Sequence, residues 1–230
     1  MLKVISMIVA MFLFVSSGSV AKYVPENEEK LLLSAAVISD VHMESNNPDR
    51  FIRFGKVLTG VTKTSRHFDI VAFTGDNTMN GQGIEWFDFY GFVNRFIKKS
   101  EVLVAMGNHD FGNTSDKEVY KELSAECLKT YNYYLGKNID KLYYSYEQNG
   151  FRFIVLCSEN NAEDTVSVIS DTQIEWLKAE LAKSANDGKP AVVLNHNLIA
   201  GKNGERSEYD FNLTNNNDKL CDALPSSSAP

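Results

Sequence analysis

The sequence contains few cysteines. Its 230 residues include only Cys127, Cys157 and Cys221, an odd number. Neither a disulfide framework nor a cysteine metal site can be read from this set. Cys157 lies in an apolar run, so we expect it to be a small buried hydrophobic residue.

Positive charge is also scarce. The chain has 23 Lys and Arg against 30 Asp and Glu, a formal net charge of −7. Without residues 1–21, which contain one lysine, 22 basic residues face the same 30 acidic ones and the charge becomes −8. An acidic surface repels nucleic acid backbones, and no basic tract interleaved with aromatic residues offsets that repulsion. No nucleic-acid-binding groove is expected.

A membrane-spanning run is missing as well. The apolar stretch at residues 4–15 is interrupted by one serine, whereas a spanning helix needs about 20 apolar residues. Lys3 precedes this stretch and Ser-Val-Ala follows at 19–21, the pattern of an export signal cleaved after Ala21. We expect a secreted, periplasmic or cell-surface protein with no membrane span after cleavage. An uncleaved anchor is the alternative, and a buried core helix is disfavoured because residues 22–30 are polar.

The remaining chain has the composition of one globular domain, which we place at residues 31–224. With 43% hydrophobic residues it can bury a substantial core. Short apolar runs alternate with longer segments of helical period, and Asn149-Gly150 predicts a hairpin between 143–147 and 151–157. The fold class is therefore α/β with a mixed core. We expect strands at 31–39, 69–74, 102–106 and 191–194, and helices at about 49–64, 84–99, 116–135 and 171–184.

Polar groups that can bind metals follow four of the predicted strands. Ligand sites of open α/β sheets lie at the carboxyl ends of the strands. Taken singly, an Asp-x-His or Gly-Asp is as well explained by a turn, and a lone His by a structural role. Taken together, they form an oxygen and nitrogen ligand set for two divalent ions. The clusters are Asp40-Val41-His42, Gly75-Asp76-Asn77, Gly107-Asn108-His109-Asp110 and Asn195-His196-Asn197.

In order, spacing and strand context, these clusters resemble the motifs of the calcineurin-like metallophosphoesterases. The likeness extends over residues 35–197 and includes Gln173, Trp176, Leu177 and Leu181 of the helix before His196. It implies a four-layer α/β/β/α sandwich of two mixed sheets flanked by helices. It also implies a metal-dependent hydrolase of phosphomonoesters or phosphodiesters.

The resemblance further implies a role for each polar residue. Asp40 and His42 would hold one metal ion, Asp76 would bridge, and Asn108 and His196 would hold the second. The ions would be manganese, iron or zinc. His109 would act as general acid or transition-state stabiliser, and Asp110 would orient it. Two ions sharing a carboxylate can deprotonate water near neutral pH, which makes this assignment chemically sensible.

The sequence departs from the family at its end. The family's Gly-His-x-His motif, which completes both metals, does not occur, and no histidine follows His196. We expect a truncated or frameshifted reading of a longer protein, with the last strands and ligands encoded within a few tens of codons beyond codon 230. The alternative is a non-catalytic phosphate- or metal-binding protein of the same fold. A third possibility, amide or lactone cleavage, has no supporting His-x-His-x-Asp-His cluster.

Overall fold

The computed structural model describes residues 31–64, 67–163, 166–197, 199, 213–214 and 216–224. The expected export signal at residues 1–21 lies outside this part of the chain. The described elements are β1 (Ala35–Ile38), α1 (Pro48–Thr62), β2 (Ile70–Thr74), α2 (Gly83–Phe96), β3 (Glu101–Ala105), the 3₁₀ turn η2 (His109–Phe111), α3 (Lys117–Leu135), β4 (Tyr144–Gln148), β5 (Phe151–Val155), β6 (Asn160–Glu163), β7 (Val166–Val168), α4 (Asp171–Asn186), β8 (Ala191–Leu194), β9 (Leu213–Thr214) and α5 (Asn217–Ala223).

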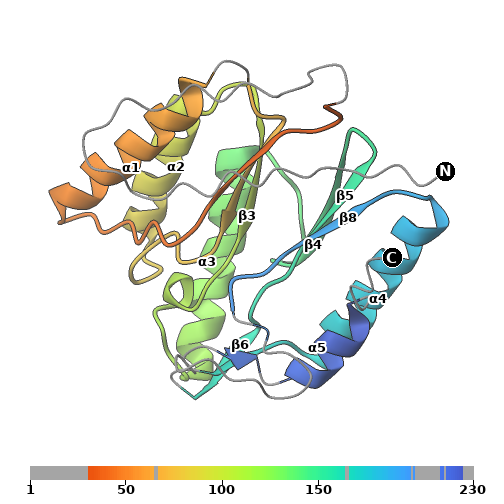
Figure 1. Ribbon diagram of the computed structural model, residues 1–230. Helices are drawn as coiled ribbons and strands as arrows, with labels where there is room; N and C mark the ends of the chain where they lie inside the picture. The colour runs from red at the N-terminus through yellow and green to blue at the C-terminus, as the bar shows by residue number, and fades with distance from the viewer. Residues whose placement is uncertain are drawn as a thin grey trace.

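Two three-stranded sheets form the centre of the fold. The first has the order β1-β2-β3, and its described strands are all parallel. The second has the order β4-β5-β8, with β4 and β5 antiparallel and β5 and β8 parallel. Helices α1, α2 and α3 lie outside the first sheet, and α4 and α5 lie outside the second (Figure 1). The α/β/β/α expectation is thus confirmed, with the mixed character found in the second sheet.

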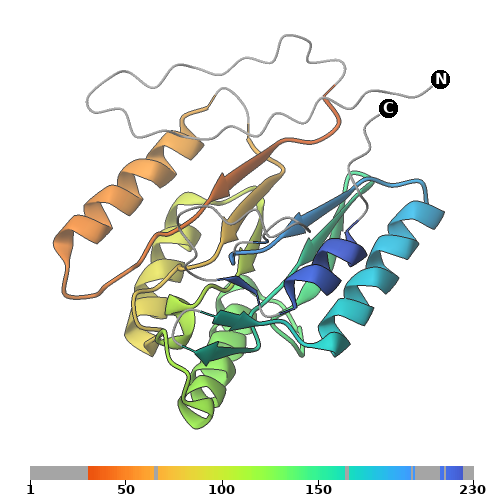
Figure 2. The same cartoon turned by 60° about the horizontal axis from the view of Figure 1, so that its bottom comes forward.

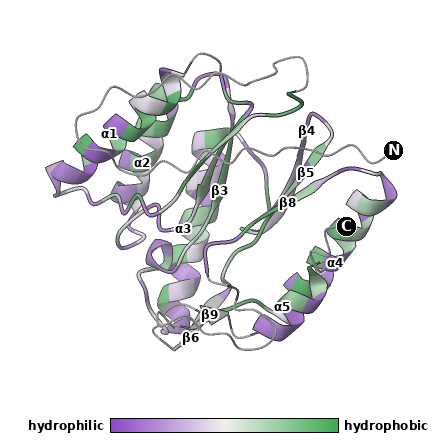
Figure 3. Ribbon diagram, in the orientation of Figure 1, coloured by the Kyte–Doolittle hydropathy of each residue, from purple (hydrophilic) through white to green (hydrophobic). Residues whose placement is uncertain are grey.

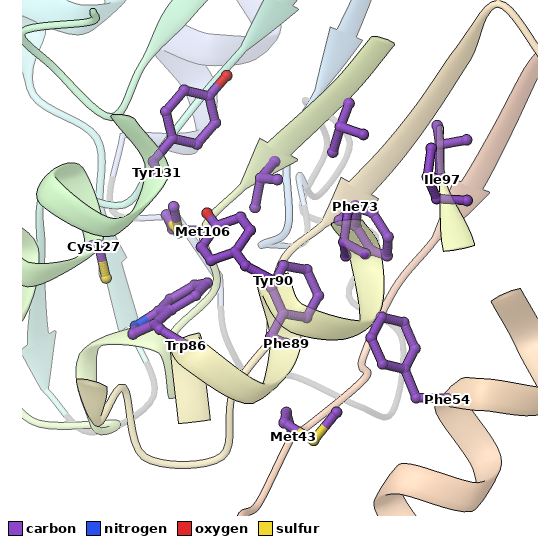
Figure 4. Close-up of a cluster of buried hydrophobic side chains, with 14 of the residues drawn as sticks. Met43, Phe54, Phe73, Trp86, Phe89, Tyr90, Ile97, Met106, Cys127 and Tyr131 are labelled. Carbon is purple, nitrogen blue, oxygen red and sulfur yellow. The ribbon is translucent and has the colours of Figure 1, made fainter. Parts of the chain in front are cut away.

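Alternation along each strand decides which layer a side chain joins. Val71 and Phe73 of β2 pack against the helices, whereas Ile70 and Ala72 face the second sheet. Because both faces of β2 are buried, its sequence is apolar up to the final Thr74. Figure 4 shows the helix-side cluster, in which the rings of Phe73 and Phe89 lie 5.0 Å apart in an edge-to-face arrangement.

The same division holds in β5. Phe151 and Phe153 face the first sheet, while Ile154 and the following Leu156 pack toward α4 and α5. In Figure 3 the helices carry both colours, as expected for helices with one buried face. The molecule therefore has three apolar interfaces between its four layers.

Local signals set the helix ends. Asp116 accepts hydrogen bonds from the first-turn amides of α3, and Gly136 ends that helix with φ of 62°. Ser170 caps α4 by accepting from the amide of Gln173 at 3.2 Å. The buried side-chain amide of Gln173 bonds both the N–H and the C=O of Cys157, at 3.0 and 2.8 Å. This pairing fixes α4 to the chain just after β5.

Two strands are shorter than expected. The first begins at Ala35 rather than at residue 31, because the amide of Ser34 donates to the carboxylate of Asp69 at 2.8 Å. The strand expected at 151–157 ends at Val155. Cys157 instead forms an isolated bridge with Met106, beyond the end of β3. Cys157 is buried as expected, and its bridge joins the two sheets.

A third small sheet, with the order β6-β7-β9, was not expected from the sequence. It lies on the lower side of the molecule, which Figure 2 brings forward. Strand β6 reads Asn-Asn-Ala-Glu and β7 has only three residues, so neither carries a period-2 apolar signal. Among the described helices, none is long and apolar enough to cross a membrane.

Candidate metal centre

The first two polar clusters are joined through their backbones. The amide of Asp40 donates to the carbonyl of Gly75 at 3.1 Å, and the amide of His42 donates to the carbonyl of Asp76 at 2.8 Å. These bonds continue the parallel pairing of β1 and β2 past the strand ends. We call residues 75–79 the β2 loop and residues 107–110 the β3 loop. The amide of His109 in the β3 loop donates to Asp76 Oδ1 at 3.0 Å, which brings the third cluster to the same point.

Three of the expected ligand residues have left-handed backbones. The φ angles are 57° at Asp40, 47° at His42 and 51° at Asp76. A residue other than glycine in this region costs about 1–3 kcal/mol, and such residues gather at functional sites. The structure therefore accepts strain at the positions where side chains must turn toward one another.

Two glycines permit a close approach of the loops. A Cβ atom at Gly107 would lie 2.2 Å from Asp76 Oδ1 and 2.7 Å from Cδ2 of His196. At Gly75, where φ is 108°, a Cβ atom would lie 2.5 Å from Cγ of His196. The fourth cluster thus packs directly on the second and third, and no larger residue fits at either glycine.

Asp76 lies at the centre of the candidate ligands. Its Oδ1 is 3.3 Å from Nε2 of His196, and its Oδ2 is 3.7 Å from Nε2 of His42. Nε2 of His42 is also 3.6 Å from Oδ1 of Asp40. Ligand atoms gather in two groups that share Asp76, within 4.8 Å in each: one adds Asp40 and His196, the other His42 and His109. The structure thus brings together residues from all four strand ends.

Backbone carbonyls orient two of the imidazoles. Nδ1 of His196 lies 3.0 Å from the carbonyl of Thr74, and Nδ1 of His109 lies 2.9 Å from the carbonyl of Met79. A carbonyl oxygen only accepts, so the hydrogen must be on Nδ1 in both rings. Their Nε2 atoms are then free to bind a metal ion or a proton. Sequence reasoning missed these carbonyls because every residue carries one.

Asn108 presents an unused acceptor. Its Nδ2 donates to Oδ1 of Asn113 at 3.0 Å, which fixes the orientation of the amide. Its Oδ1 is buried and has no hydrogen-bond partner among the described residues. A buried acceptor without a partner costs free energy unless a ligand satisfies it. Asn113 was not predicted, although its position five residues after Asn108 in the same turn is a local signal.

Contacts among the candidate ligands shift the pKa values of two of these residues. The pKa of Asp40 is lowered to about 2, chiefly by its hydrogen bond with His42, although burial opposes the shift. Burial acts to lower the pKa of His196, but the hydrogen bond and the charge of Asp76 outweigh it, so the pKa is raised. The raised pKa of His196 shows that the neighbouring carboxylates favour a positive charge at this imidazole.

Asp110 departs from its expected role. The resemblance implied that it orients His109, but the carbonyl of Met79 contacts Nδ1 of that ring instead. The Asp110 carboxylate is fully buried and accepts hydrogen bonds from Gly107, Asn77 and Thr78. Burial raises its pKa to about 6 despite these bonds. The difference arises because the Asp110 side chain points into the loops, away from the imidazole.

The arrangement fits divalent metal ions on three counts. Carboxylate, amide oxygen and imidazole nitrogen form the donor set that manganese, iron and zinc accept. The buried Oδ1 of Asn108 has no hydrogen-bond partner among the described residues, and the Nε2 atoms of His196 and His42 both lie within 4 Å of the Asp76 carboxylate. The glycines leave the space through which these groups meet.

Comparison with known proteins shows the family of this chain. A sequence model described as calcineurin-like phosphoesterase matches residues 33–223, so the chain belongs to that family. Among curated proteins it is similar to one from Rhodococcus erythropolis (strain PR4 / NBRC 100887) named "Probable cyclic nucleotide phosphodiesterase", with 28% identity over 163 residues. That stretch covers 66% of this chain and 48% of the relative, so the chain spans about half the relative's length.

Proposed function

We propose that this chain is a phosphoester hydrolase that works with two divalent metal ions bridged by Asp76. The observation that carries the proposal is the position of that carboxylate. Its two oxygens face two different imidazoles, Nε2 of His196 at 3.3 Å and Nε2 of His42 at 3.7 Å. A carboxylate placed between two such groups can act as the ligand that bridges two metal ions. Asp40 and His42 would complete one side, and Asn108 and His196 the other, although in the metal-free geometry the atoms of Asp40 lie with those of His196 and the atoms of His42 with those of His109.

When bound, two such ions would neutralise charge on the phosphoester and lower the pKa of a water molecule. The chain's own residues supply position and protons. Asp76 sets the spacing of the two sides, and the Thr74 carbonyl keeps Nε2 of His196 directed at Asp76. His109 is held through Nδ1, so its Nε2 can carry a proton and deliver it to the leaving-group oxygen. General acid catalysis of this kind contributes about 10²- to 10⁴-fold.

For the substrate, we propose a small phosphodiester, with a cyclic nucleotide as the first candidate. The name of the Rhodococcus relative supports this choice, at 28% identity over a partial alignment. The acidic composition also disfavours a long polyanion as substrate, because such a chain would be repelled over many charges. An aryl phosphodiester and an aryl phosphomonoester are suitable first probes.

The test compares three histidine and aspartate variants in the product of the gene's full reading frame. Asp76→Asn should lose bound metal and turnover together, because both sides share this carboxylate. His109→Ala should keep its metal while the maximal rate falls at least ~10²-fold. His67→Ala is the matched control, because His67 is exposed and precedes β2 at the opposite edge of the sheet.

Metal content by elemental analysis and rates with manganese, zinc or iron separate the outcomes. If His109→Ala loses metal in proportion to activity, His109 is a ligand and not the proton donor. If the parent takes up metal and binds inorganic phosphate but hydrolyses neither probe, the protein is a non-catalytic phosphate- or metal-binding protein and the hydrolase proposal fails. If the parent takes up no divalent metal, the proposal fails.

A further inference from the structure

Asp110 is the acceptor shared by the two loops that carry the central ligands. We propose that its buried carboxylate is a positioning residue, which holds the β2 loop against the β3 loop and thereby sets the place of Asp76 relative to Asn108 and His109. The inference rests on the proposed function only for its effect on metal binding. Its effect on the loops themselves follows from the hydrogen bonds alone.

The two oxygens of the Asp110 carboxylate accept hydrogen bonds from both loops. Oδ1 accepts from the amide and the hydroxyl of Thr78, at 2.8 and 2.9 Å. Oδ2 accepts from the amide of Gly107 at 2.9 Å, from Nδ2 of Asn77 at 2.9 Å and from the amide of Asn77 at 3.3 Å. Two segments about thirty residues apart in the sequence therefore meet on one side chain.

The groups that bond Asp110 lie next to the proposed metal ligands in the sequence. Asn77 and Thr78 directly follow Asp76, and Gly107 directly precedes Asn108, so the bonded atoms are one or two residues from each proposed ligand. The Nδ2 group of Asn77 also donates to the carbonyl of Ala105 at 2.9 Å, which ties the β2 loop to the end of β3.

Asp110 also affects His109, the proposed proton donor, indirectly through the β2 loop. Thr78, which it holds, is followed by Met79, and the carbonyl of Met79 lies 2.9 Å from Nδ1 of His109. A shift of the β2 loop would therefore turn the imidazole as well as displace the carboxylate of Asp76. This indirect route accounts for the position of Asp110 beside His109 in the sequence without contact between the two side chains.

The chemistry of the site requires a carboxylate. All of the neighbouring groups donate, and Thr78 Oγ1 already accepts from the amide of Gly81 at 3.2 Å. An ionised carboxylate accepts through both oxygens, whereas an amide would turn an NH₂ group toward some of these donors. Among the described residues no basic side chain forms an ion pair with Asp110, so its charge is stabilised by these donors alone.

The loops provide a matched control. Glu85 is a second buried carboxylate, which accepts from the amide and Nδ2 of Asn80 at 2.9 Å and from the amide of Gln82 at 3.2 Å. It holds the start of α2 and bonds neither ligand loop in these contacts. Glu85→Gln therefore reproduces the loss of a buried, multiply bonded carboxylate outside the site.

The first measurement is hydrogen–deuterium exchange of the metal-free protein, which does not depend on the proposed function. Asp110→Asn should speed exchange at Asn77, Thr78 and Gly107 at least ~10-fold, because the amides of these residues lose charge-assisted bonds. Glu85→Gln should speed exchange only around residues 80–85. If Asp110→Asn does not fold, Thr78→Val serves instead, since it removes one donor and keeps the side-chain shape. Unchanged exchange at Asn77, Thr78 and Gly107 would overturn the inference.

The second measurement uses Co²⁺ alone, whose visible absorption reports the geometry of its ligands. Asp110→Asn should bind Co²⁺ at least ~10-fold more weakly and with an altered spectrum, while Glu85→Gln should match the parent. An unaltered affinity and spectrum in Asp110→Asn would overturn the positioning role while leaving the proposed function intact. If the parent itself binds no Co²⁺, the proposed function is at fault, and the exchange result alone decides whether Asp110 joins the loops.

Discussion

The substitution Gly107→Ala is the smallest change expected to disable the centre. A methyl carbon at this position would lie 2.2 Å from Oδ1 of Asp76 and 2.5 Å from its amide nitrogen. Non-bonded atoms prefer separations of about 3.5 Å, so the groups must move apart by roughly 1 Å. The backbone of Gly107 is not in the left-handed region, so the added methyl acts through its contacts and not through backbone strain.

The cost is expected in both metal binding and stability. The added methyl group presses on the central carboxylate and on Cδ2 of His196, 2.7 Å away, and neither is a freely moving side-chain tip. Overpacking of this kind costs about 1–3 kcal/mol of stability. A displacement of about 1 Å at a reacting centre reduces rates by about 10²-fold, and we expect a loss of that order in turnover.

The assay measures divalent metal affinity by calorimetric titration, and stability by thermal unfolding with a chelator present. Gly91→Ala is the control, because Gly91 lies inside α2 and a Cβ atom there would meet nothing within 4 Å. That change should leave metal affinity unaltered and stabilise the helix by about 0.5–1 kcal/mol. Equal metal affinities for Gly107→Ala and the parent would show that the loops do not approach as closely as described.

Two further predictions concern pH and export. The pKa of His196 is raised above its ordinary 6.5 in the metal-free protein, so its protonated form contributes stability that is fully present below pH 6.5 and lost as pH rises through the raised value. With a chelator present, the free energy of unfolding should therefore fall over that window, and more steeply in the parent than in His196→Gln; identical slopes would contradict the charge interaction with Asp76. Independently, N-terminal sequencing of the exported product should begin at Lys22, and an intact Met1 terminus in the soluble cytoplasmic fraction would refute the export signal.

The sequence by itself determined the class of fold and the main ligand candidates. Apolar runs such as Ile70–Thr74 mark buried strands, because a strand covered on both faces has few positions for polar groups. Although His196 follows β8 of the other sheet, the polar residues just after the strands of the first sheet, among them Asp40 and Asp76, could be assigned to one edge because the ends of parallel strands meet there. Neither inference needs knowledge of a distant partner.

Only the tertiary structure decided how these residues are oriented. The carbonyls of Thr74 and Met79 hold the rings of His196 and His109, and a backbone carbonyl is chemically the same in every residue, so no letter of the sequence marks it. The partners of Asp110 were hidden for a related reason, since three of its five donors are backbone amides. These contacts come from the packing of two loops about thirty residues apart, and local composition cannot specify which atoms then face each other.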